Sequence, residues 1–305
     1  MLFLSCSKDD DSSDELWSSA PGKHSYAIDV DGVERQLHVH IPNSYNGQSV
    51  PLVIMFHGSG GSGQSVYLSS QWKELSEVEG FIVVFPTALE YFVVELQKMQ
   101  TKWSAGGLEG ELEPGDEIVD DIPFVREILN QARDAYKIDD SSIYASGFSN
   151  GGGFCRSRVM TELSDEFAAI GTAGGIGLPL AVPQQSSDII SLHTITGTND
   201  DKIRKKFMQM GELPIVGQEV MEHHGLRPEI DNICEMLQLD TTYTEVTERP
   251  HFNTLTFDNS LAGNDNEYRI RLVKGMGHVY PNGQNHASGL VAAELFWEFF
   301  NDHVK

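Results

Sequence analysis

The sequence predicts an α/β fold: a mostly parallel central sheet with helices on both faces and an N-terminal antiparallel hairpin. Short, almost wholly apolar runs bounded by Gly or Pro recur along the chain, which is the pattern of strands buried on both faces. Longer stretches of helical periodicity separate these runs and indicate crossover connections between parallel strands. Near the start, two stretches that alternate apolar and polar residues flank Asp31-Gly32, a two-residue hairpin turn.

The predicted elements follow in chain order. The hairpin pairs residues 24–30 with residues 33–41, and a helix over residues 64–79 ends at Gly80. The expected buried strands are residues 51–56, 81–85, 141–146, 167–173, 189–196, 252–257 and 268–274. The other expected helices are residues 119–136, the stretch that follows 147–153 to about residue 163, and residues 288–303. Two stretches, 88–115 and 202–228, break the alternation and are predicted to be long loops, which usually carry function or disorder.

Composition excludes several classes of protein. The chain has 305 residues, of which 40% are hydrophobic and 22% charged, so it can bury a large core without disulfide staples. Three Cys are too few for a disulfide scaffold, and no apolar run approaches the roughly 18 residues of a membrane span. A net charge of −24 repels nucleic acid and anionic lipid and suits neutral substrates.

A candidate nucleophile lies in the motif Gly147-Phe-Ser149-Asn-Gly151. A bare G-x-S-x-G arises by chance, but here it stands between an apolar strand and a helix, the context of a nucleophile elbow. The Ser of such a turn is strained, and side chains at the two Gly positions would collide with the neighbouring strand and helix. Ser149 is therefore expected at the carboxyl end of the sheet, with helix N–H groups behind it. The alternative is a phosphate-binding turn, which no G-x-x-x-x-G-K pattern supports.

A second Gly-rich loop, residues 57–63, follows the strand 51–56. In this kind of fold the early strand-to-helix loop supplies one N–H group of an oxyanion hole, and the residue after the nucleophile supplies the other. The candidates are the backbone N–H groups of Ser59 and Asn150. We expect His57 to hold the loop in place and not to act as a base.

The acid and the base are expected after two later strands. Asp200 follows the strand 189–196, where a carboxylate can orient a His, and Asp201 is its nearest rival. His278 follows the strand 268–274 within a Gly-rich loop, and the chain order Ser, Asp, His is that of this fold class.

Other acidic and His residues fit structural positions better. His38 and His40 share the solvated face of a strand, and the adjacent His223 and His224 do not converge on one metal ion. Asp120 and Asp121 open a helix, where carboxylates serve as caps.

Together these motifs resemble the secreted α/β-hydrolase esterases grouped with polyhydroxybutyrate depolymerases and feruloyl esterases. The resemblance runs from about residue 24 to the C-terminus. The matching residues are Asp31-Gly32, Arg35, Ile41-Pro42, Tyr45, Pro51 to Ile54, His57-Gly58, Trp103, Asp120 to Val125, Gly147 to Gly152, Gly197 to Asp200 and Gly277 to Pro281.

The resemblance implies a serine carboxylic-ester hydrolase with the nucleophile at Ser149, the acid at Asp200 and the base at His278, and without a metal or cofactor. Feruloyl-type, hydroxyalkanoate and short-chain esters are the substrate classes that it suggests. The chain departs from the family at Ser59, where Cys is frequent, and at Tyr280, where Trp is frequent. Tyr280 is a candidate substrate-binding residue.

Two other functions stay open from the sequence. One is a serine peptidase or acyltransferase on the same scaffold, because the choice of scissile bond depends on the pocket. The other is a non-catalytic surface binding lipoprotein built on a hydrolase fold.

The N-terminus resembles the end of a bacterial lipoprotein signal, in which Cys6 would become the lipidated first residue. We divide the chain into residues 1–20, a truncated lipoprotein-type signal and flexible acidic tether, and residues 21–305, a single α/β-hydrolase catalytic domain. This predicts an extracellular, cell-surface or periplasmic protein, lipid-anchored in a bacterial envelope. The alternative is a frayed cytosolic N-terminus.

The other two Cys have no CxxC partner, so metal and redox motifs are not indicated. Cys155 lies in an apolar helical stretch and is predicted to be a buried free thiol. Export would permit a bond between Cys155 and Cys234, and the sequence leaves this pairing open.

The stretch 88–115 is expected to cover the carboxyl ends of the strands beside Ser149, where ligands bind in open α/β sheets. Tyr91 and Phe92 could equally pack into the core. Trp103 is predicted to be a substrate platform, because polar residues and glycines around it indicate an exposed turn.

Overall fold

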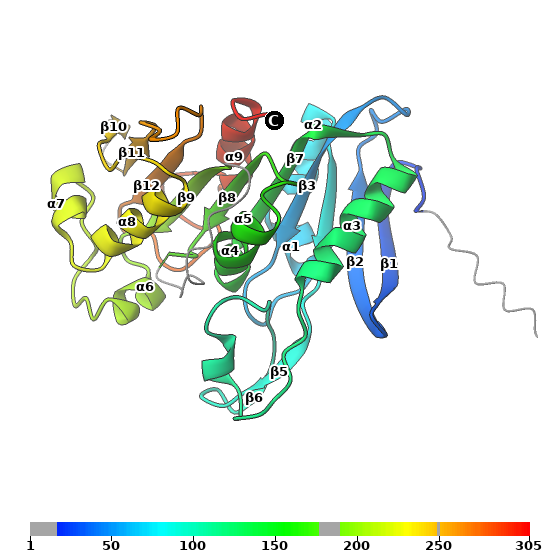
Figure 1. Ribbon diagram of the computed structural model, residues 1–305, viewed down its shortest axis with the longest axis horizontal. Coiled ribbons are helices and arrows are strands. Elements are labelled where there is room, and N and C mark those ends of the chain that lie inside the picture. Colours follow the sequence, from blue (N-terminus) through cyan, green and yellow to red (C-terminus); the bar gives the residue numbers. More distant parts are fainter. Residues whose placement is uncertain (1–16, 177–189, 249–250) are drawn as a thin grey trace, which may run out of the picture.

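The computed structural model describes residues 17–176, 190–248 and 251–305, and its centre is a sheet to which ten of the described strands contribute (Figure 1). The order across the sheet is β1-β2-β4-β3-β7-β8-β9-β12-β11-β10. The bounds are β1 Gly22–Val30, β2 Val33–Ile41, β3 Val50–Phe56, β4 Ile82–Pro86, β7 Ile138–Phe148, β8 Ala169–Ala173, β9 Ser191–Gly197, β10 Thr244–Glu248, β11 Phe252–Phe257 and β12 Tyr268–Val273.

The six central strands, from β4 to β12 in the sheet order, are parallel, so their carboxyl ends meet at one edge. The hairpin β1–β2 is antiparallel, with Val30 paired to Val33 across the Asp31-Gly32 turn, and joins β4 in antiparallel sense. The predicted fold class is therefore confirmed. The opposite edge adds a second antiparallel pair, β11 and β10, of which the sequence indicated only the strand 252–257.

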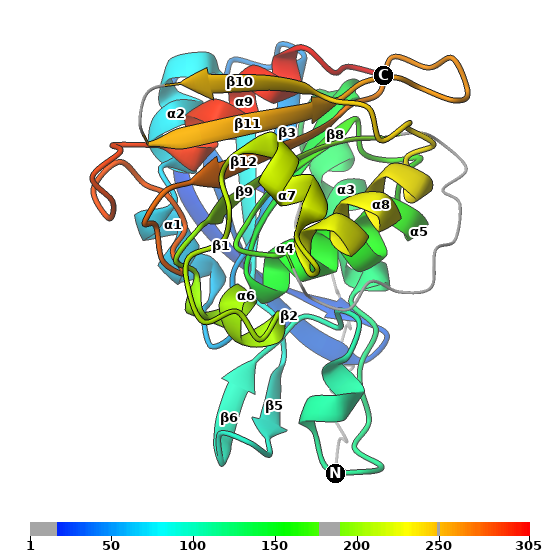
Figure 2. The same ribbon diagram turned by 90° about the vertical axis from the view of Figure 1, so that its left-hand side faces the viewer.

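Helices cover both faces of the sheet (Figures 1 and 2). On one face, α1 Gly63–Ser69, α2 Trp72–Glu79 and α9 Ala292–Asn301 bury aromatic residues such as Trp72 and Phe296 against the strands. On the other face lie α3 Ile122–Ala135, α4 Asn150–Phe154, a π-helical turn Cys155–Val159, α5 Met160–Glu162 and α8 Leu226–Met236. The apolar faces of these helices explain why the central strands are apolar on both sides.

The helix predicted over residues 64–79 is divided in two. Gln71 has a left-handed backbone, with a φ of 68°, and separates α1 from α2. Gly80 ends α2 in the left-handed conformation, with a φ of 83°, as predicted. The closing helix α9 begins at Ala292 and not at residue 288.

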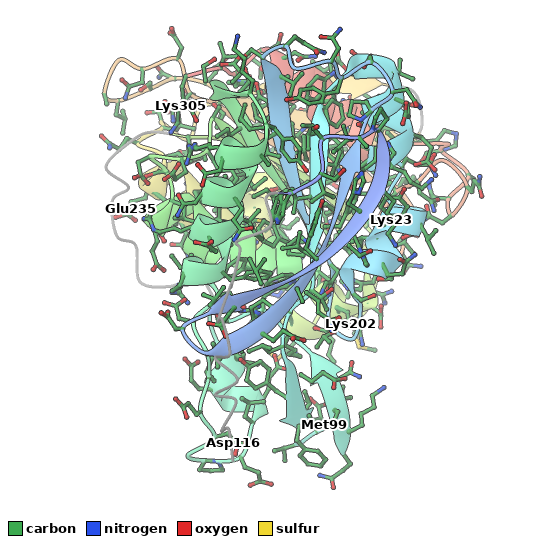
Figure 3. All side chains as sticks on the ribbon, turned by 90° about the vertical axis from the view of Figure 1, so that its right-hand side faces the viewer. Lys23, Met99, Asp116, Lys202, Glu235 and Lys305 are labelled. Atoms are coloured by element: carbon green, nitrogen blue, oxygen red, sulfur yellow. The ribbon has the colours of Figure 1, made fainter. Side chains whose placement is uncertain are left out.

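The stretch 202–228, predicted to be a loop, contains α6 Asp201–Lys206, α7 Gly217–Glu222 and the start of α8. That prediction is wrong, because scattered apolar residues such as Ile203 and Val220 each reach the core from a short helix. The stretch 88–115 contains a hairpin of β5 Glu90–Val93 and β6 Lys98–Thr101 and a 3-10 turn at Leu108–Glu111. The hairpin and the 3-10 turn extend beyond the rest of the molecule at one end, and we call them the projection (Figure 1). Figure 3 shows Met99 and Asp116 at the far end of the projection and Lys202 at the same end of the molecule.

Candidate active site

Ser149 stands on a strained turn at the carboxyl end of β7, directly before α4. Its φ is 52° and its ψ is −117°, a combination that a residue with a side chain rarely adopts. The flanking glycines are required by close approach: a Cβ on Gly147 would lie 2.5 Å from the Gly151 carbonyl oxygen. A Cβ on Gly151 would lie 2.5 Å from the carbonyl oxygen of His57. The turn therefore holds the Ser149 hydroxyl away from the sheet, as a nucleophile elbow does.

The structure brings Ser149, His278 and Asp200 together in one line of hydrogen bonds. The Ser149 Oγ lies 2.8 Å from His278 Nε2, and His278 Nδ1 lies 2.7 Å from Asp200 Oδ2. In the tautomer with the proton on Nδ1, the imidazole donates to the carboxylate and accepts from the hydroxyl. This arrangement allows the imidazole to take the hydroxyl proton while the carboxylate stabilises the resulting positive charge.

Asp200 is held rigidly from the opposite side. Its carboxylate is 1% exposed, and Oδ1 accepts from the backbone N–H groups of Lys202 and Ile203, at 3.0 and 3.1 Å, as the N-cap of α6. The other oxygen is thereby left for His278. Asp201, the rival acid, is 72% exposed at its side chain and faces Lys202, so it does not reach the imidazole.

His57 is buried and stabilises the Gly-rich loop of residues 57–63, which we call the oxyanion loop because the sequence predicts an oxyanion donor in it. Its Nδ1 donates to the Gly58 carbonyl at 2.7 Å, and its Nε2 accepts from the Ala88 N–H at 3.0 Å. Burial lowers the pKa of His57 to about 4, so the imidazole is neutral at physiological pH. The Gly58 carbonyl also accepts from the Gly61 N–H. Because a trans peptide points its C=O and N–H in opposite directions, fixing this carbonyl also fixes the Ser59 N–H.

Trp103 is not on an exposed turn, so this prediction from the sequence is wrong. The side chain is 0% exposed and does not line the cavity described below. The polar neighbours that indicated exposure are themselves buried: Lys102 pairs with Glu111, and the Ser104 N–H donates to Asp121. The indole donates from Nε1 to the His57 carbonyl at 2.9 Å. Trp103 therefore contacts the oxyanion loop and not solvent.

The stretch 88–115 lies beside the oxyanion loop but contributes no residue to the lining of the described cavity. The Gly60 N–H donates to the Thr101 carbonyl at 2.9 Å, and the Thr101 hydroxyl donates to the Gly61 carbonyl. Tyr91 is buried under the projection, and Phe92 is 39% exposed. The stretch therefore supports the loop and does not form the cavity wall that the sequence suggested.

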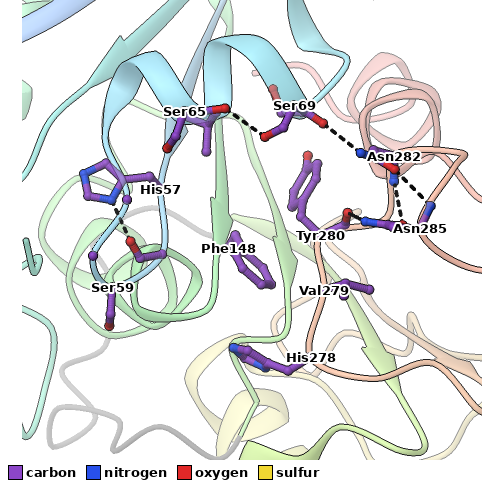
Figure 4. Close-up of a pocket in the computed structure, with 15 residues that line it drawn as sticks. His57, Ser59, Ser65, Ser69, Phe148, His278, Val279, Tyr280, Asn282 and Asn285 are labelled. Carbon is purple, nitrogen blue, oxygen red and sulfur yellow. Dashed lines mark hydrogen bonds between the residues drawn. The ribbon is translucent and has the colours of Figure 1, made fainter. Parts of the chain in front are cut away.

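A cavity of about 400 Å³ opens beside His278 and Phe148 (Figure 4). Ser59, Ser65, Ser69, Asn282 and Asn285 line it with hydroxyl and amide groups, and its described lining includes no Asp, Glu, Lys or Arg. The amide of Asn282 donates to the Ser69 carbonyl at 3.3 Å and joins the two walls. Spacing of four residues places Ser65 and Ser69 on one face of α1, a signal that sequence reasoning missed.

Tyr280 also lines the cavity, but its hydroxyl turns inward. The hydroxyl accepts from Trp72 Nε1 at 2.9 Å and lies 3.4 Å from the Ser146 hydroxyl. The ring packs edge-on against Phe148, which in turn packs against the His278 imidazole. Tyr280 thus presents ring surface and not a hydroxyl to a ligand.

Asp121 has a different partner from the one predicted. Its side chain makes no cap hydrogen bond and is instead 2.5 Å from Arg35, with both side chains 1% exposed. Asp120 accepts from the Ile122 N–H at 2.9 Å, as a residue at a helix start does. Arg35 also lies over the Phe124 ring, so this pair joins the edge hairpin to α3.

Cys155 and Cys234 are both free and buried, so the free thiol predicted for Cys155 is confirmed. Burial raises the pKa of Cys234 to about 12, which keeps this thiol protonated and unreactive. Across residues 17–176, 190–248 and 251–305 we find no group of His, Cys, Asp or Glu that could hold a metal ion. Within the same ranges, every helix is too short or too polar to cross a membrane.

Comparisons with known proteins agree with this architecture. No family model matches the chain. The bifunctional acetylxylan esterase/xylanase XynS20E of Neocallimastix patriciarum is 28% identical over 170 residues, which are 56% of this chain and 22% of that protein. Feruloyl esterase B of Thermothelomyces thermophilus is 23% identical over 153 residues, 50% of this chain and 48% of that enzyme. The chain therefore spans about a fifth of the first relative and about half of the second.

Solved structures show the fold. An acetyl xylan esterase from Aspergillus awamori superposes with a TM-score of 0.58 over 91% of this chain and 99% of that chain, at 14% identity. The chain thus has an α/β-hydrolase fold. Its resemblance to esterases of the polyhydroxybutyrate depolymerase and feruloyl esterase type also holds.

Proposed function

We propose that the protein is a serine carboxylic-ester hydrolase that acts through Ser149, His278 and Asp200. The observation that carries the proposal is the unbroken line of hydrogen bonds from the Ser149 hydroxyl to the buried carboxylate of Asp200. The base lies within hydrogen-bond reach of both the nucleophile and the orienting acid, which is the geometric requirement of acyl transfer by Ser.

In the first half of the reaction, Ser149 Oγ attacks the ester carbonyl carbon while its proton passes to His278 Nε2. The carbonyl oxygen becomes an oxyanion. When this tetrahedral intermediate collapses, the bond to the alcohol oxygen breaks, and His278 gives its proton to the departing alcohol. The product is an acyl ester on Ser149. Asp200 takes no part in these proton transfers and stabilises the imidazolium that forms between them.

In the second half, water replaces the alcohol. His278 Nε2 takes a proton from the water as its oxygen attacks the acyl carbon. The new tetrahedral intermediate collapses, the carboxylic acid leaves, and the proton returns from His278 to Ser149 Oγ. Electrons and protons balance without an oxidant, a metal or a cofactor.

The oxyanion of both intermediates is assigned to the backbone N–H groups of Ser59 and Asn150. Asn150 is the first residue of α4, where N–H groups lack intrahelical partners, and the Ser59 peptide is held by the contacts of His57. Each donor of this kind is worth about 3–4 kcal/mol in the transition state.

The substrate is proposed to be a neutral ester whose non-reacting part occupies the cavity beside His278. The hydroxyl and amide lining offers hydrogen bonds without a charged partner, and the net charge of −24 disfavours anionic substrates. Feruloyl-type, hydroxyalkanoate and short-chain esters all satisfy this condition. The names of these two relatives favour testing acetylated xylan and feruloyl esters first.

We propose separately that the protein is exported and lipid-anchored at Cys6, a residue that lies outside the described part of the chain. The division of the chain at residue 20 is likewise a proposal. Incorporation of a radiolabelled fatty acid into the full chain, and its loss in Cys6→Ala, is the expected result. An unlabelled full chain rejects the anchor.

The test of the proposed activity compares wild type, Ser149→Ala and the control Ser76→Ala. Ser76 is a buried Ser on α2 whose hydroxyl donates to the Phe81 carbonyl. Wild type and the control should hydrolyse p-nitrophenyl acetate, and Ser149→Ala should lose at least about 10³-fold in kcat while it stays folded. Retained activity in Ser149→Ala rejects the assignment. A wild type that cleaves peptide amides but no ester indicates a peptidase.

A further inference from the structure

The two proposed oxyanion donors belong to different parts of the fold. The Ser59 N–H lies in the loop after β3, and the Asn150 N–H lies at the start of α4. An oxyanion can accept from both only if their separation is held to a fraction of an ångström, because hydrogen-bond strength falls steeply with misplacement. The fold must therefore contain something that fixes one element relative to the other.

Trp103 makes polar contacts to both elements at once. Its backbone N–H donates to Asn150 Oδ1 at 2.8 Å, and its carbonyl accepts from Asn150 Nδ2 at 3.4 Å. Its indole Nε1 donates to the His57 carbonyl at 2.9 Å. One residue thus binds the side chain of the residue after the nucleophile and the backbone of the oxyanion loop.

The contacts of the ring leave Trp103 little freedom to move. The indole stacks on Phe154 of α4 at 5.5 Å between centroids and meets Phe56 of β3 edge-on at 5.1 Å. The residues on either side of Trp103 are anchored by Glu111 and Asp121. Both the ring and the backbone of Trp103 are therefore fixed to the body of the protein.

We propose that Trp103 and the side chain of Asn150 form a clamp that fixes the two backbone N–H groups of the oxyanion hole at their working separation. Asn150 then has two separate roles: its backbone N–H contacts the oxyanion, and its side chain holds that N–H in place. Trp103 is a positioning residue. The inference rests on the proposed function, since it concerns the same site.

Packing of the core alone does not account for these contacts. A buried ring contributes its dispersion and hydrophobic energy without polar partners, and Phe would serve. Here three of the four hydrogen bonds of Trp103 reach the two elements that carry the proposed donors, and the fourth joins its carbonyl to the nearby Ala105 N–H. The expected defect on removing them is therefore in transition-state stabilisation and not only in stability.

The test uses Asn150→Ala and Trp103→Phe. Asn150→Ala removes both side-chain hydrogen bonds but keeps the backbone N–H. Trp103→Phe keeps an aromatic ring and the backbone contacts but removes the bond to His57. Ser76→Ala, which loses a buried hydrogen bond at a residue that does not line the cavity, is the matched control. The measurements are kcat and KM for p-nitrophenyl acetate, Ki for a trifluoromethyl ketone that forms an oxyanion adduct on Ser, and urea unfolding.

Each clamp variant should lose about 10- to 100-fold in kcat, with KM changed by less than about threefold. The Ki of the ketone should rise in proportion to the loss in kcat/KM, because both depend on oxyanion binding. The kcat of the double variant should be only slightly below that of the less active single variant, because both substitutions disrupt the same clamp. The control should lose stability without loss of kcat.

Clamp variants with kcat within twofold of wild type, while Ser149→Ala is inactive, would overturn the clamp and leave the proposed function standing. The clamp is also overturned if kcat falls but Ki for the ketone does not rise. If Asn150→Ala fails to fold, Trp103→Phe decides alone. An inert wild type rejects the proposed function, and the clamp falls with it.

Discussion

Replacement of Asp200 by Asn should abolish turnover by reversing the polarity of one hydrogen bond, without unfolding the site. Asp200 uses Oδ1 to cap α6 and Oδ2 to accept from His278. Asn caps a helix about as well as Asp, so the amide oxygen is expected to keep its place on the two N–H groups of α6. The amide NH₂ then faces His278 Nδ1.

Replacing the carboxylate oxygen by an amide NH₂ changes which nitrogen of His278 carries the proton. Facing a donor, Nδ1 must accept, so the proton moves to Nε2, and the imidazole can no longer take the Ser149 proton. The amide could turn round only by giving up two capping bonds, at 3.0 and 3.1 Å, and by facing two donors with its NH₂. Losing that cap costs about 2 kcal/mol, so roughly 3% of molecules would hold the productive orientation.

A productive fraction of about 3% lowers kcat about 30-fold by itself, and the neutral amide also stabilises the imidazolium less than the carboxylate does. Together the two effects should lower kcat for p-nitrophenyl acetate about 10³- to 10⁴-fold, similar to the effect of this substitution in serine proteases. Asp201→Asn is a matched control, since Asp201 is the next residue and its side chain is 72% exposed. The control should keep full activity, and urea unfolding of both variants should be within about 1 kcal/mol of wild type. A kcat for Asp200→Asn within tenfold of wild type would refute the reasoning.

Further predictions concern the supporting structure. Burial lowers the pKa of His57 to about 4, so between about pH 6.5 and pH 4 the unfolded chain binds a proton at His57 that the folded protein does not. As the pH is lowered through this range, the free energy of unfolding should therefore fall by up to about 3 kcal/mol. His57→Gln should flatten this part of the urea-unfolding profile, and parallel profiles would contradict the prediction. Gly151→Ala should cost about 2–3 kcal/mol because its Cβ would meet backbone carbonyls, whereas Gly110→Ala, with no atom within 4 Å, should cost far less. Equal costs in denaturant titration would reject the close-approach argument.

The proximity of Ser149, Asp200 and His278 could be predicted from the sequence because it depends on topology. Each residue follows a buried strand, and the carboxyl ends of parallel strands meet at one edge of a sheet. Short apolar runs and their Gly boundaries are local signals that identify such strands. The distances between the three side chains then follow from a sheet order that the sequence pattern only implies.

The burial of Trp103 could not be predicted from the sequence in the same way. Lys102 and Ser104 look like surface residues, but Glu111 and Asp121 satisfy them inside the protein. Such pairing depends on how the chain folds back on itself over 9 and 17 residues, and the pattern of neighbouring residues does not indicate it. The division of the helix at Gln71 is similar, since its left-handed backbone carries no Gly or Pro signal.

The central claim is that Ser149 is a nucleophile activated by His278, and labelling with a fluorophosphonate probe tests it most directly. The probe forms a covalent bond with an activated Ser Oγ and expels fluoride, so it needs no knowledge of the natural ester. Mass spectrometry of the labelled wild type should place one adduct on Ser149, and His278→Ala should label at least about 10²-fold more slowly. No adduct on wild type, or an adduct on another Ser that forms equally fast in His278→Ala, would contradict the account.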